Sequence, residues 1–313
     1  MKKRIILPKE FKARYSKILG RENKRFLNYC MRPLRKSIRI NTLKTDKEKC
    51  LKLLKNKGWK LTPIPWCNDG FWVDGEKIEE KLGNTLEYFM GYYYIQEASS
   101  MIPPAVLRPT EKDFVLDIAA SPGSKTGQMA QMMKNKGCII ANDVRIERLK
   151  MLKYNLEKLG VINTVVTKMD GRRFWKTNMK FDKILVDAPC SSEGTVRKNW
   201  KALSRWSPEL IRYISNVQKH LLDSAVRCLK SNGILVYSTC TLAPEENEGV
   251  IDYVLKKYQD LDVVKVSLRG LKYREGLKEW DGREYDDRVT KCARIWPQDN
   301  DTEGFFVAKL VRK

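Results

Sequence analysis

The sequence predicts an α/β protein: a Rossmann-like sheet of parallel strands, preceded by a small basic α+β domain. Two observations lead to this fold class. From residue 114 onward, short apolar runs alternate with amphipathic helical stretches, the pattern of a parallel sheet covered by helices. Before that point the segments are shorter and strongly basic. We therefore expect an N-terminal module over residues 1–100 and a larger domain over residues 101–313.

The positive charge of the chain is concentrated near its N-terminal end. The 313 residues carry a formal net charge of +23, and residues 1–60 alone contain 21 Lys and Arg against 4 Asp and Glu. Charge placed in this way attracts and steers polyanions, so we expect nucleic acid as a partner. A Lys-rich thermophilic proteome would explain many charges of both signs, but not so few acids in this stretch.

The remaining composition narrows the class of protein. No apolar run reaches the ~20 residues that a membrane span needs, and the charged first eight residues lack the apolar core of a signal peptide. Eight cysteines without a C-x-x-C pair, and one histidine, argue against a zinc site and a disulfide scaffold. We expect a cytoplasmic protein with no bound metal and no membrane contact.

The N-terminal module reads as alternating short helices and strands. Residues 9–30 form a basic amphipathic helical region, and the alternation around Ile38 and Ile40 in 34–44 predicts a strand. Residues 46–57 predict a helix, and two short strands follow near 60–64 and 70–73. Such a module suits contact with an RNA or DNA backbone. The alternative is an N-terminal extension that only packs on the main domain.

Residues 87–107 pass from an aromatic cluster into a predicted helix that contains Ser99 and Ser100. Tyrosines beside Gln96 could hold the edge of a base. They fit a seam between domains equally well, and we favour the seam.

The first strand of the sheet is predicted at 114–118. It runs into the small residues of 119–126, and a helix continues over 127–134. Small residues between a strand and a helix let a ligand approach the backbone and the free N–H groups at the helix start. The loop is neither G-x-G-x-x-G nor G-x-x-x-x-G-K-[ST], so we expect no diphosphate to bind there.

Acids end the next two strands. The strand at 138–142 is followed by Asp143, placed to accept hydrogen bonds from ribose hydroxyls, and the strand at 164–168 precedes Asp170, near where an adenine amino group would lie. An adenosine-containing cofactor without a diphosphate fits this pattern. We therefore expect S-adenosyl-L-methionine, whose cationic sulfonium needs no phosphate cradle.

Two further apolar runs each end near a cysteine. The strand at 182–186 leads to Asp187 and Cys190, and the strand at 233–240 ends at Cys240. If these strands are neighbours, the three side chains meet in one crevice at the carboxyl ends of the sheet. One thiol would then be a nucleophile. A loop of interleaved basic and aromatic residues over 197–206 suits single-stranded nucleic acid.

The remaining elements close the fold. A long helix is predicted over 208–229, and another begins within 241–248. The tail, at 289–296 and 304–310, reads as an antiparallel pair of strands.

At this point the sequence resembles the NSUN (Nol/Nop/Sun) family of RNA cytosine-C5 methyltransferases, in particular its compact archaeal members without an added RNA-binding domain. The two cysteine motifs match without a break, whereas Ser121 and Ser124 occupy positions that the family often fills differently. The resemblance covers nearly all of the chain from about residue 30. The motifs are Arg-Ile-Asn-Thr-Leu-Lys at 39–44, Tyr94 to Ser100, Asp-Ile-Ala-Ala-Ser-Pro-Gly-Ser-Lys-Thr at 117–126, Asp-Ala-Pro-Cys-Ser at 187–191, Ser-Thr-Cys-Thr at 238–241, Arg-Ile-Trp-Pro at 294–297 and Gly304-Phe305-Phe306.

The resemblance implies a Rossmann-like S-adenosylmethionine-dependent methyltransferase domain and a chemistry for its residues. Cys240 would add to cytosine C6, Cys190 would help to remove a proton or release the product, and Asp187 would bond the N3/N4 edge. The implied cofactor residues are Ala119, Ala120, Ser121, Pro122, Gly123, Ser124, Lys125, Asp143, Arg148, Asp170 and Asp187. The RNA-contacting residues that we expect are Arg39, Asn41, Lys44, Gln96, Lys198 and Arg294.

Several alternatives remain open at the level of sequence. A DNA cytosine-C5 methyltransferase also has a nucleophile after a proline, as Cys190 follows Pro189, but this leaves Cys240 unexplained and the chain lacks a Glu-Asn-Val run. A non-catalytic RNA-binding scaffold would not need both cysteines and the cofactor acids. Among RNA substrates we favour transfer RNA over ribosomal RNA, and we expect a monomer.

Overall fold

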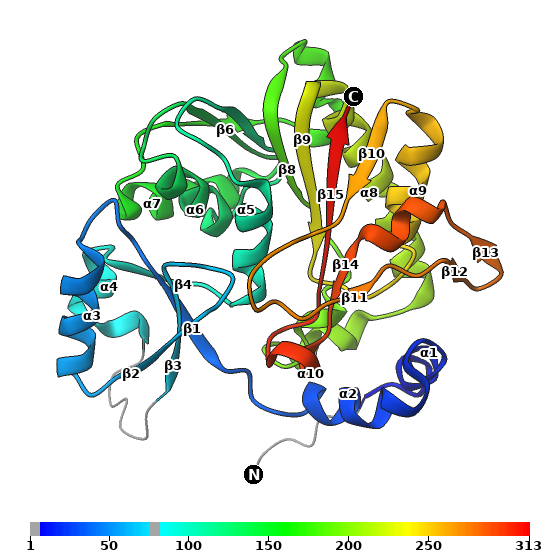
Figure 1. The fold of residues 1–313 in the computed structure, drawn as a ribbon, viewed down its shortest axis with the longest axis horizontal. Helices are drawn as coiled ribbons and strands as arrows, with labels where there is room; N and C mark the ends of the chain where they lie inside the picture. The colour runs from blue at the N-terminus through cyan, green and yellow to red at the C-terminus, as the bar shows by residue number, and fades with distance from the viewer. Residues whose placement is uncertain (1–6, 75–81) are drawn as a thin grey trace.

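In the computed structural model, which describes residues 7–74 and 82–313, a large mixed sheet stands beside a smaller antiparallel one (Figure 1). Within these residues the large sheet has nine strands in the order β11-β14-β15-β9-β8-β5-β6-β7, with β10 also paired to β15. Strands β5 to β9 run parallel, and the others are antiparallel additions. The strands are β5 (Phe114–Asp117), β6 (Cys138–Asp143), β7 (Thr164–Lys168), β8 (Phe181–Asp187), β9 (Leu229–Thr239), β10 (Leu261–Val264), β11 (Arg274–Glu275), β14 (Ala293–Ile295) and β15 (Phe305–Arg312).

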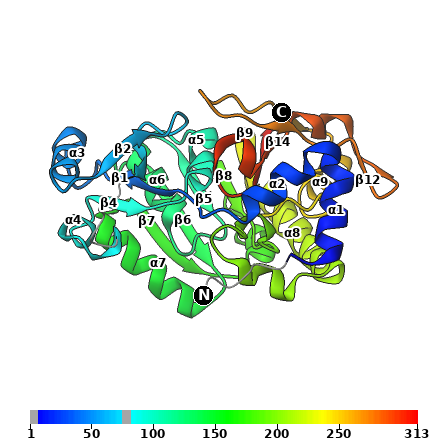
Figure 2. The same ribbon diagram turned by 90° about the horizontal axis from the view of Figure 1, so that it is seen from below.

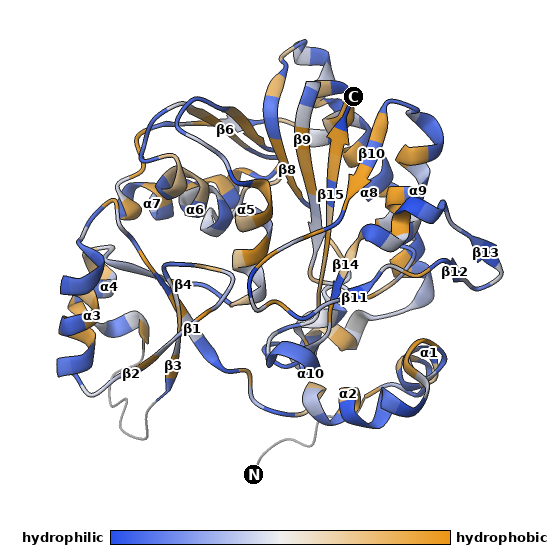
Figure 3. Cartoon of the chain, viewed as in Figure 1, coloured by the Kyte–Doolittle hydropathy of each residue, from blue (hydrophilic) through white to orange (hydrophobic). Residues whose placement is uncertain are grey.

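Helices cover both faces of the large sheet, which confirms the predicted fold class (Figure 1). On one face α5 (Ile102–Leu107) and α6 (Ser124–Met132) enclose a core that includes Val115 and Ile139, and α7 (Ile146–Leu159) packs against Ala141 of β6. The other face is covered by α8 (Pro208–Cys228) and α9 (Glu248–Lys257). Apolar colouring accordingly concentrates along the central strands and the inner sides of these helices (Figure 3).

The helix and strand bounds follow from local sequence signals. Helix α7 ends at Gly160, whose φ of +70° lies in the left-handed region that glycine adopts at a helix end. Helix α8 begins after Ser207, whose hydroxyl accepts the backbone N–H of Leu210. Helix α9 begins later than the sequence predicts, because residues 244–247 form a turn before it. The tail forms the predicted antiparallel pair, β14 with β15.

The smaller sheet forms the basic module on the α5–α7 side of the molecule. Its order is β2-β3-β1-β4, and Ile38 and Ile40 pack with Trp59 and Tyr93 in its core. Strand β4 differs from the prediction of an aromatic stretch leading into a helix, because Tyr93–Ile95 pairs with β1. The elements are β1 (Lys36–Ile40), α3 (Lys47–Asn56), β2 (Lys60–Pro63), β3 (Gly70–Asp74), α4 (Leu86–Phe89) and β4 (Tyr93–Ile95).

The first two helices lie apart from this module, beside the large sheet (Figure 2). The predicted helical region over 9–30 divides into α1 (Lys9–Leu19) and α2 (Asn23–Cys30), with a break at Gly20, whose φ is +53°. Phe26 packs edge-on against Trp296, just before α10 (Pro297–Asn300). The alternative interpretation, an extension that packs on the main domain, therefore describes these two helices. The module of β1–β4, in contrast, has a sheet and a hydrophobic core of its own.

A two-stranded hairpin, β12 (Glu279–Trp280) with β13 (Arg283–Glu284), projects beside α9. No helix in 7–74 or 82–313 is at once long and apolar enough to cross a membrane. Most of the N-terminal segment examined for a signal peptide, residues 1–6, lies outside the described residues.

Candidate active site

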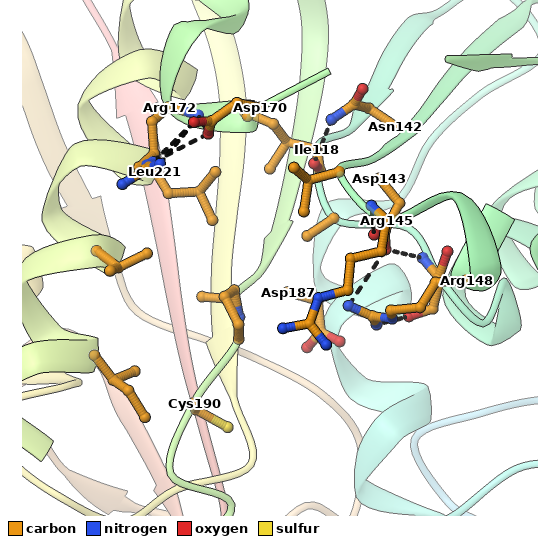
Figure 4. Close-up of a pocket in the computed structure, with 18 of the residues that line it drawn as sticks. Ile118, Asn142, Asp143, Arg145, Arg148, Asp170, Arg172, Asp187, Cys190 and Leu221 are labelled. Carbon is orange, nitrogen blue, oxygen red and sulfur yellow. Dashed lines mark hydrogen bonds and ion pairs between the residues drawn. The ribbon is translucent and has the colours of Figure 1, made fainter. Parts of the chain in front are cut away.

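A pocket of about 650 Å³ opens at the carboxyl ends of the parallel strands (Figure 4). It lies where the topology predicts a ligand site, outside the ends of β5, β6 and β8. Both sequence-predicted cysteines reach it. The lining residues are Ile118, Ala119, Ser121, Asn142, Asp143, Val144, Arg145, Arg148, Asp170, Gly171, Arg172, Asp187, Ala188, Pro189, Cys190, Ser192, Tyr213, Ile214, Val217, Leu221 and Cys240.

The two cysteines come together because their strands are neighbours. Strands β8 and β9 pair in parallel with Asp187 opposite Ser238, so the loops that follow them leave the sheet side by side. The Sγ atoms of Cys190 and Cys240 lie 3.1 Å apart, and both are free thiols. The hydroxyl of Ser192 lies 3.6 Å from the sulfur of Cys240.

The two thiols differ in acidity. The pKa of Cys240 is lowered, above all because the thiol of Cys190 donates a hydrogen bond to its sulfur, with further help from Ser192 and the Lys125 ammonium. The pKa of Cys190 is raised well above its ordinary value, because it shares that bond and is desolvated by burial. The pair therefore favours a thiolate on Cys240 and a proton on Cys190, and the thiolate is the nucleophilic form of a cysteine.

Asp187 is held in a fixed orientation beside the sulfurs. One carboxylate oxygen accepts a hydrogen bond from Lys125 Nζ at 2.7 Å, and the other accepts one from the hydroxyl of Ser238 at 2.8 Å. Lys125 itself is buried, with Nζ 5.6 Å from the centre of the Phe305 ring. The Asp187 side chain keeps 30% of its surface exposed, so it can still contact a ligand.

Carboxylates also end the other strands at the pocket. Asp143 is buried and accepts backbone N–H bonds from Ser121 and Arg145 at 3.3 and 3.1 Å. Arg148 lies 3.4 Å from the same carboxylate. Asp170 is paired with Arg172 at 2.7 Å on the far side of the pocket (Figure 4).

The cysteine loops are tied together by backbone contacts at Gly194. Its N–H donates to the carbonyl of Cys240 at 3.0 Å, and its carbonyl accepts from the N–H of Gly304 at 2.9 Å. A Cβ at position 194 would collide with the Gly304 carbonyl and lie 2.7 Å from the Cys240 carbonyl. Only glycine allows three segments to approach so closely, and the approach fixes the loop that carries Cys190 relative to Cys240.

Substituting Gly194 by alanine is expected to reduce methyl transfer at least about 100-fold, because a displacement of the reacting groups by about 1 Å has an effect of this size. The added methyl group must push the Cys190 loop away from Cys240. Single-turnover transfer from labelled cofactor measures the effect. Gly249→Ala is the matched control, since a Cβ there meets no atom closer than 3.5 Å. Equal rates for the two variants would show that the contacts at Gly194 do not position the Cys190 loop.

The structure brings many of the predicted cofactor residues to one pocket. Those that line it are Ala119, Ser121, Asp143, Arg148, Asp170 and Asp187. The others, Ala120, Pro122, Gly123, Ser124 and Lys125, form the adjoining turn and the first residues of α6. The predicted catalytic residues Cys240, Cys190 and Asp187 all line the same pocket.

The predicted RNA contacts divide into two groups. Lys44 and Lys198 are exposed and free to meet a backbone. The structure contradicts direct contact for Arg39, Asn41, Gln96 and Arg294, since each is at most 3% exposed.

These four side chains bond inside the protein instead. The guanidinium of Arg39 donates to Gln96 and Gln131, and Gln96 donates to Gln128 of α6 at 2.8 Å, so this region is the predicted seam between the module and the large sheet. Asn41 donates to the carbonyls of Gly91 and Leu159. Arg294 forms a buried, two-pronged ion pair with Glu248, with its shorter contact at 2.5 Å.

Several other residues of the site were not predicted from the sequence. Ser192 and Arg145 line the pocket, and Tyr213 of α8 does so with 70% of its surface exposed. Glu246 and Gln218 lie buried behind the Cys190 loop. The adjacency of Ser192 to Cys190 was the only available signal, because the other contacts depend on how distant segments fold together.

A pocket at the carboxyl ends of a parallel sheet, with acids at successive strand ends, fits a nucleoside-containing cofactor. Comparison with known proteins, through a family match and a solved relative, identifies the class as S-adenosylmethionine-dependent methyltransferases. A family model described as 16S rRNA methyltransferase RsmB/F matches residues 104–311, and one for the N-terminal domain of 16S rRNA methyltransferase RsmF matches residues 7–98. The chain belongs to the RsmB/F (NOL1/NOP2/Sun) family, which confirms the resemblance seen in the sequence.

Individual relatives cover the chain to different extents. A tRNA (cytosine(49)-C(5))-methyltransferase of Pyrococcus abyssi is 48% identical over 96% of this chain and 95% of its own length. A ribosomal RNA small subunit methyltransferase F of Shewanella sp. (strain ANA-3) is 46% identical over 92% of this chain, which spans only 58% of that protein.

Solved structures share the whole fold. A methyltransferase homolog protein from Pyrococcus horikoshii has a TM-score of 0.88 at 35% identity, covering 99% of this chain and 96% of that one. NSun6 from the same organism, solved with SFG, has a TM-score of 0.83 at 26% identity, covering 97% and 98% of the two chains. The protein is therefore an enzyme of the methyltransferase class that uses S-adenosyl-L-methionine, as predicted.

Proposed function

We propose that the protein methylates C5 of cytosine in RNA, with transfer RNA as its substrate, through a covalent bond between Cys240 and cytosine C6. The observation that carries this proposal is the pair of free thiols 3.1 Å apart, beside Asp187, at the mouth of the cofactor pocket. A DNA cytosine-C5 methyltransferase or a non-catalytic scaffold would leave one or both thiols without a role.

Cytosine C5 is a weak nucleophile, and addition of a thiolate at C6 makes it a stronger one. Cys240 is suited to this step because its lowered pKa favours the thiolate. Asp187, oriented by Lys125 and Ser238, would bond the N3/N4 edge of the base. Cys190 would take the C5 proton, after which the electrons of the C5–H bond restore the ring double bond and Cys240 leaves as a thiolate.

The pocket residues fit S-adenosylmethionine, which supplies an electrophilic methyl group when bound. Asp143 would accept hydrogen bonds from the ribose hydroxyls, and Asp170 would accept a hydrogen bond from the adenine amino group. The hydroxyl of Ser121 is buried at the pocket without a hydrogen-bond partner among the described residues, as expected of a group that bonds a polar ligand.

Replacing Asp143 by asparagine is expected to raise the Kd for S-adenosylmethionine about tenfold, because the hydrogen bonds of a charged acceptor are stronger than those of a neutral one by roughly 1–1.5 kcal/mol. Calorimetric titration measures the change without need of RNA. Glu147→Gln is the matched control: it removes an exposed carboxylate from the same segment. An unchanged Kd for the Asp143 variant would remove this residue from the proposed cofactor site.

Two features support transfer RNA as the substrate class. The Pyrococcus abyssi relative, which this chain matches nearly end to end, is named as a tRNA methyltransferase, whereas this chain covers little more than half of the Shewanella rRNA enzyme. The exposed Lys44 and Lys198 and the basic module would hold the phosphate backbone. We further propose that the protein acts as a monomer in the cytoplasm.

The test uses labelled S-adenosylmethionine with separate transfer and ribosomal RNA transcripts made in vitro, which carry no methyl group at C5 before the reaction. We expect labelled 5-methylcytosine in transfer RNA, lost when the cytosine at position 49 of a transcript is replaced by uridine. The target base must be unpaired or flipped out to expose C6. Label confined to ribosomal RNA would instead establish the alternative substrate class, and label in neither RNA would overturn the proposal.

A further inference from the structure

A buried carboxyl lies directly behind the Cys190 loop, and the proposed chemistry gives it no role. Glu246 is fully buried, and its Oε2 accepts hydrogen bonds from the backbone N–H of Ser191 at 3.0 Å and from Gln218 Nε2 at 2.9 Å. Its other oxygen, Oε1, is buried with no hydrogen-bond partner among the described residues. An unpaired carboxylate oxygen in the interior is costly, so its protonation state needs an explanation.

The side-chain amide of Gln218 also has a buried oxygen that lacks a hydrogen-bond partner among the described residues. Gln218 Nε2 also donates to the carbonyl of Pro189 at 2.8 Å, and because a carbonyl can only accept, the amide orientation is fixed. Gln218 Oε1 is then a second buried oxygen with no partner among the described residues. Both unpaired atoms are acceptors as long as Glu246 is ionised. A proton on Glu246 would make its Oε1 a donor. Because the Gln218 amide already bonds the other oxygen of this carboxyl, an acid–amide pair with two hydrogen bonds would satisfy both atoms.

The surroundings agree with a neutral acid. The titratable groups that face Glu246 are Glu193, Tyr237 of β9 and Cys190 of the loop, none of which is a cation, and α8 contributes the neutral Gln218. Burial, together with the nearby Glu193, raises the pKa of Glu246 to about 8. An ionised Glu246 would in turn raise the pKa of Cys190.

We propose that Glu246 is a positioning residue for this reaction: as a neutral acid paired with the Gln218 amide, it fixes the loop at Pro189 and Ser191 and keeps negative charge away from Cys190 Sγ. The inference rests on the proposed function, in which Cys190 must give its own proton to solvent before it can take the C5 proton. A carboxylate behind Cys190 would oppose that ionisation and delay release of Cys240 from the base.

The first experiment reads the thiol without RNA. In a Cys240→Ser background, the rate at which iodoacetamide alkylates Cys190 is followed by mass spectrometry from pH 7 to 10. Glu246→Gln keeps the neutral pairing, because an amide can accept from Ser191 and donate to Gln218 Oε1. Above pH 8 we expect Cys190 to react about tenfold faster in this variant than with Glu246 present, since an adjacent charge shifts a pKa by about one unit. Identical profiles would overturn the proposal whether or not the protein methylates RNA.

The second experiment measures turnover and the protein–RNA adduct. We expect Glu246→Gln to match the parent enzyme within about threefold at pH 7 and to become faster than the parent above pH 8, where ionisation of Glu246 in the parent offsets the gain in Cys190 thiolate and leaves more adduct unresolved. Glu246→Ala should lose at least about tenfold in turnover with an unchanged Kd for the cofactor. Glu245→Gln is the control, because that carboxylate pairs with Arg14 and Trp280 instead. A Glu246→Gln enzyme as slow as Glu246→Ala at pH 7 would mean that an ionised carboxylate is required. Absence of any methylation by the parent enzyme would count against the proposed function alone.

Discussion

Cys240→Ala is expected to lower methyl transfer to RNA by a factor on the order of 10⁴ or more, because no other group can add to C6 and activate the base. Binding of S-adenosylmethionine should be unchanged, since the cofactor acids lie at the end of β6, just after β7 and at the end of β8 rather than on the Cys240 loop. Single-turnover transfer of the labelled methyl group, with the cofactor Kd measured in parallel, separates the two effects.

Cys138→Ala is the matched control for this prediction. Cys138 is also a free, partly buried thiol, but it lies at the start of β6, away from the pocket mouth.

The parent enzyme should also lose activity at low pH: methyl transfer falls as the pH drops through the lowered pKa of Cys240, because the thiolate is lost. Methylation that persists in Cys240→Ala would return the nucleophile to Cys190 and revive the DNA-enzyme mechanism.

Cys190→Ala is expected to trap the reaction after methylation. Without a group at Cys190 to take the C5 proton, Cys240 stays bonded to the base, and a protein–RNA adduct that resists denaturant should accumulate while turnover falls about 100-fold. Electrophoresis in denaturant with labelled RNA measures the adduct. The double variant Cys190→Ala/Cys240→Ala must lose it.

The same substitution has a second effect, with opposite consequences for adduct formation. The hydrogen bond from Cys190 is the largest influence that lowers the pKa of Cys240, so its removal raises that pKa. We therefore expect the adduct of Cys190→Ala to form at higher pH than the reaction of the parent enzyme requires. An adduct in Cys240→Ala but not in Cys190→Ala would show that the two roles are exchanged.

Sequence patterns predicted those helices and strands whose signals lie within their own residues. The 164–168 strand has the predicted bounds and the 138–142 strand is one residue longer than predicted, because their apolar runs lie within the segments themselves. The meeting of Asp187, Cys190 and Cys240 followed from the rule that parallel strands present their carboxyl ends together. These inferences require only the direction and adjacency of strands.

The sequence could not show which charged side chains are buried. Arg39 of the basic module and Arg294 of the tail were expected to contact RNA, and only the folded chain brings Gln131 and Glu248 to them from 92 and 46 residues away. Strand β4 was missed for a related reason: three residues carry too little periodicity to identify a strand, and the pairing with β1 decides it. Glu246 needed the same long-range knowledge.

The position of β15 has a consequence for how the enzyme is made. This strand, residues 305–312, lies inside the sheet, with β9 along one edge and β10 and β14 along the other, and its leading residues contact the Cys190 loop through Gly304. During synthesis the parallel strands emerge first but lack this neighbour until residue 312 has left the ribosome. Pairing over such sequence separations is slow, so a nascent chain exposes the open edge of β9 during translation. Because Gly304 contacts the Cys190 loop, we expect the active site to reach its final geometry only after β15 has inserted.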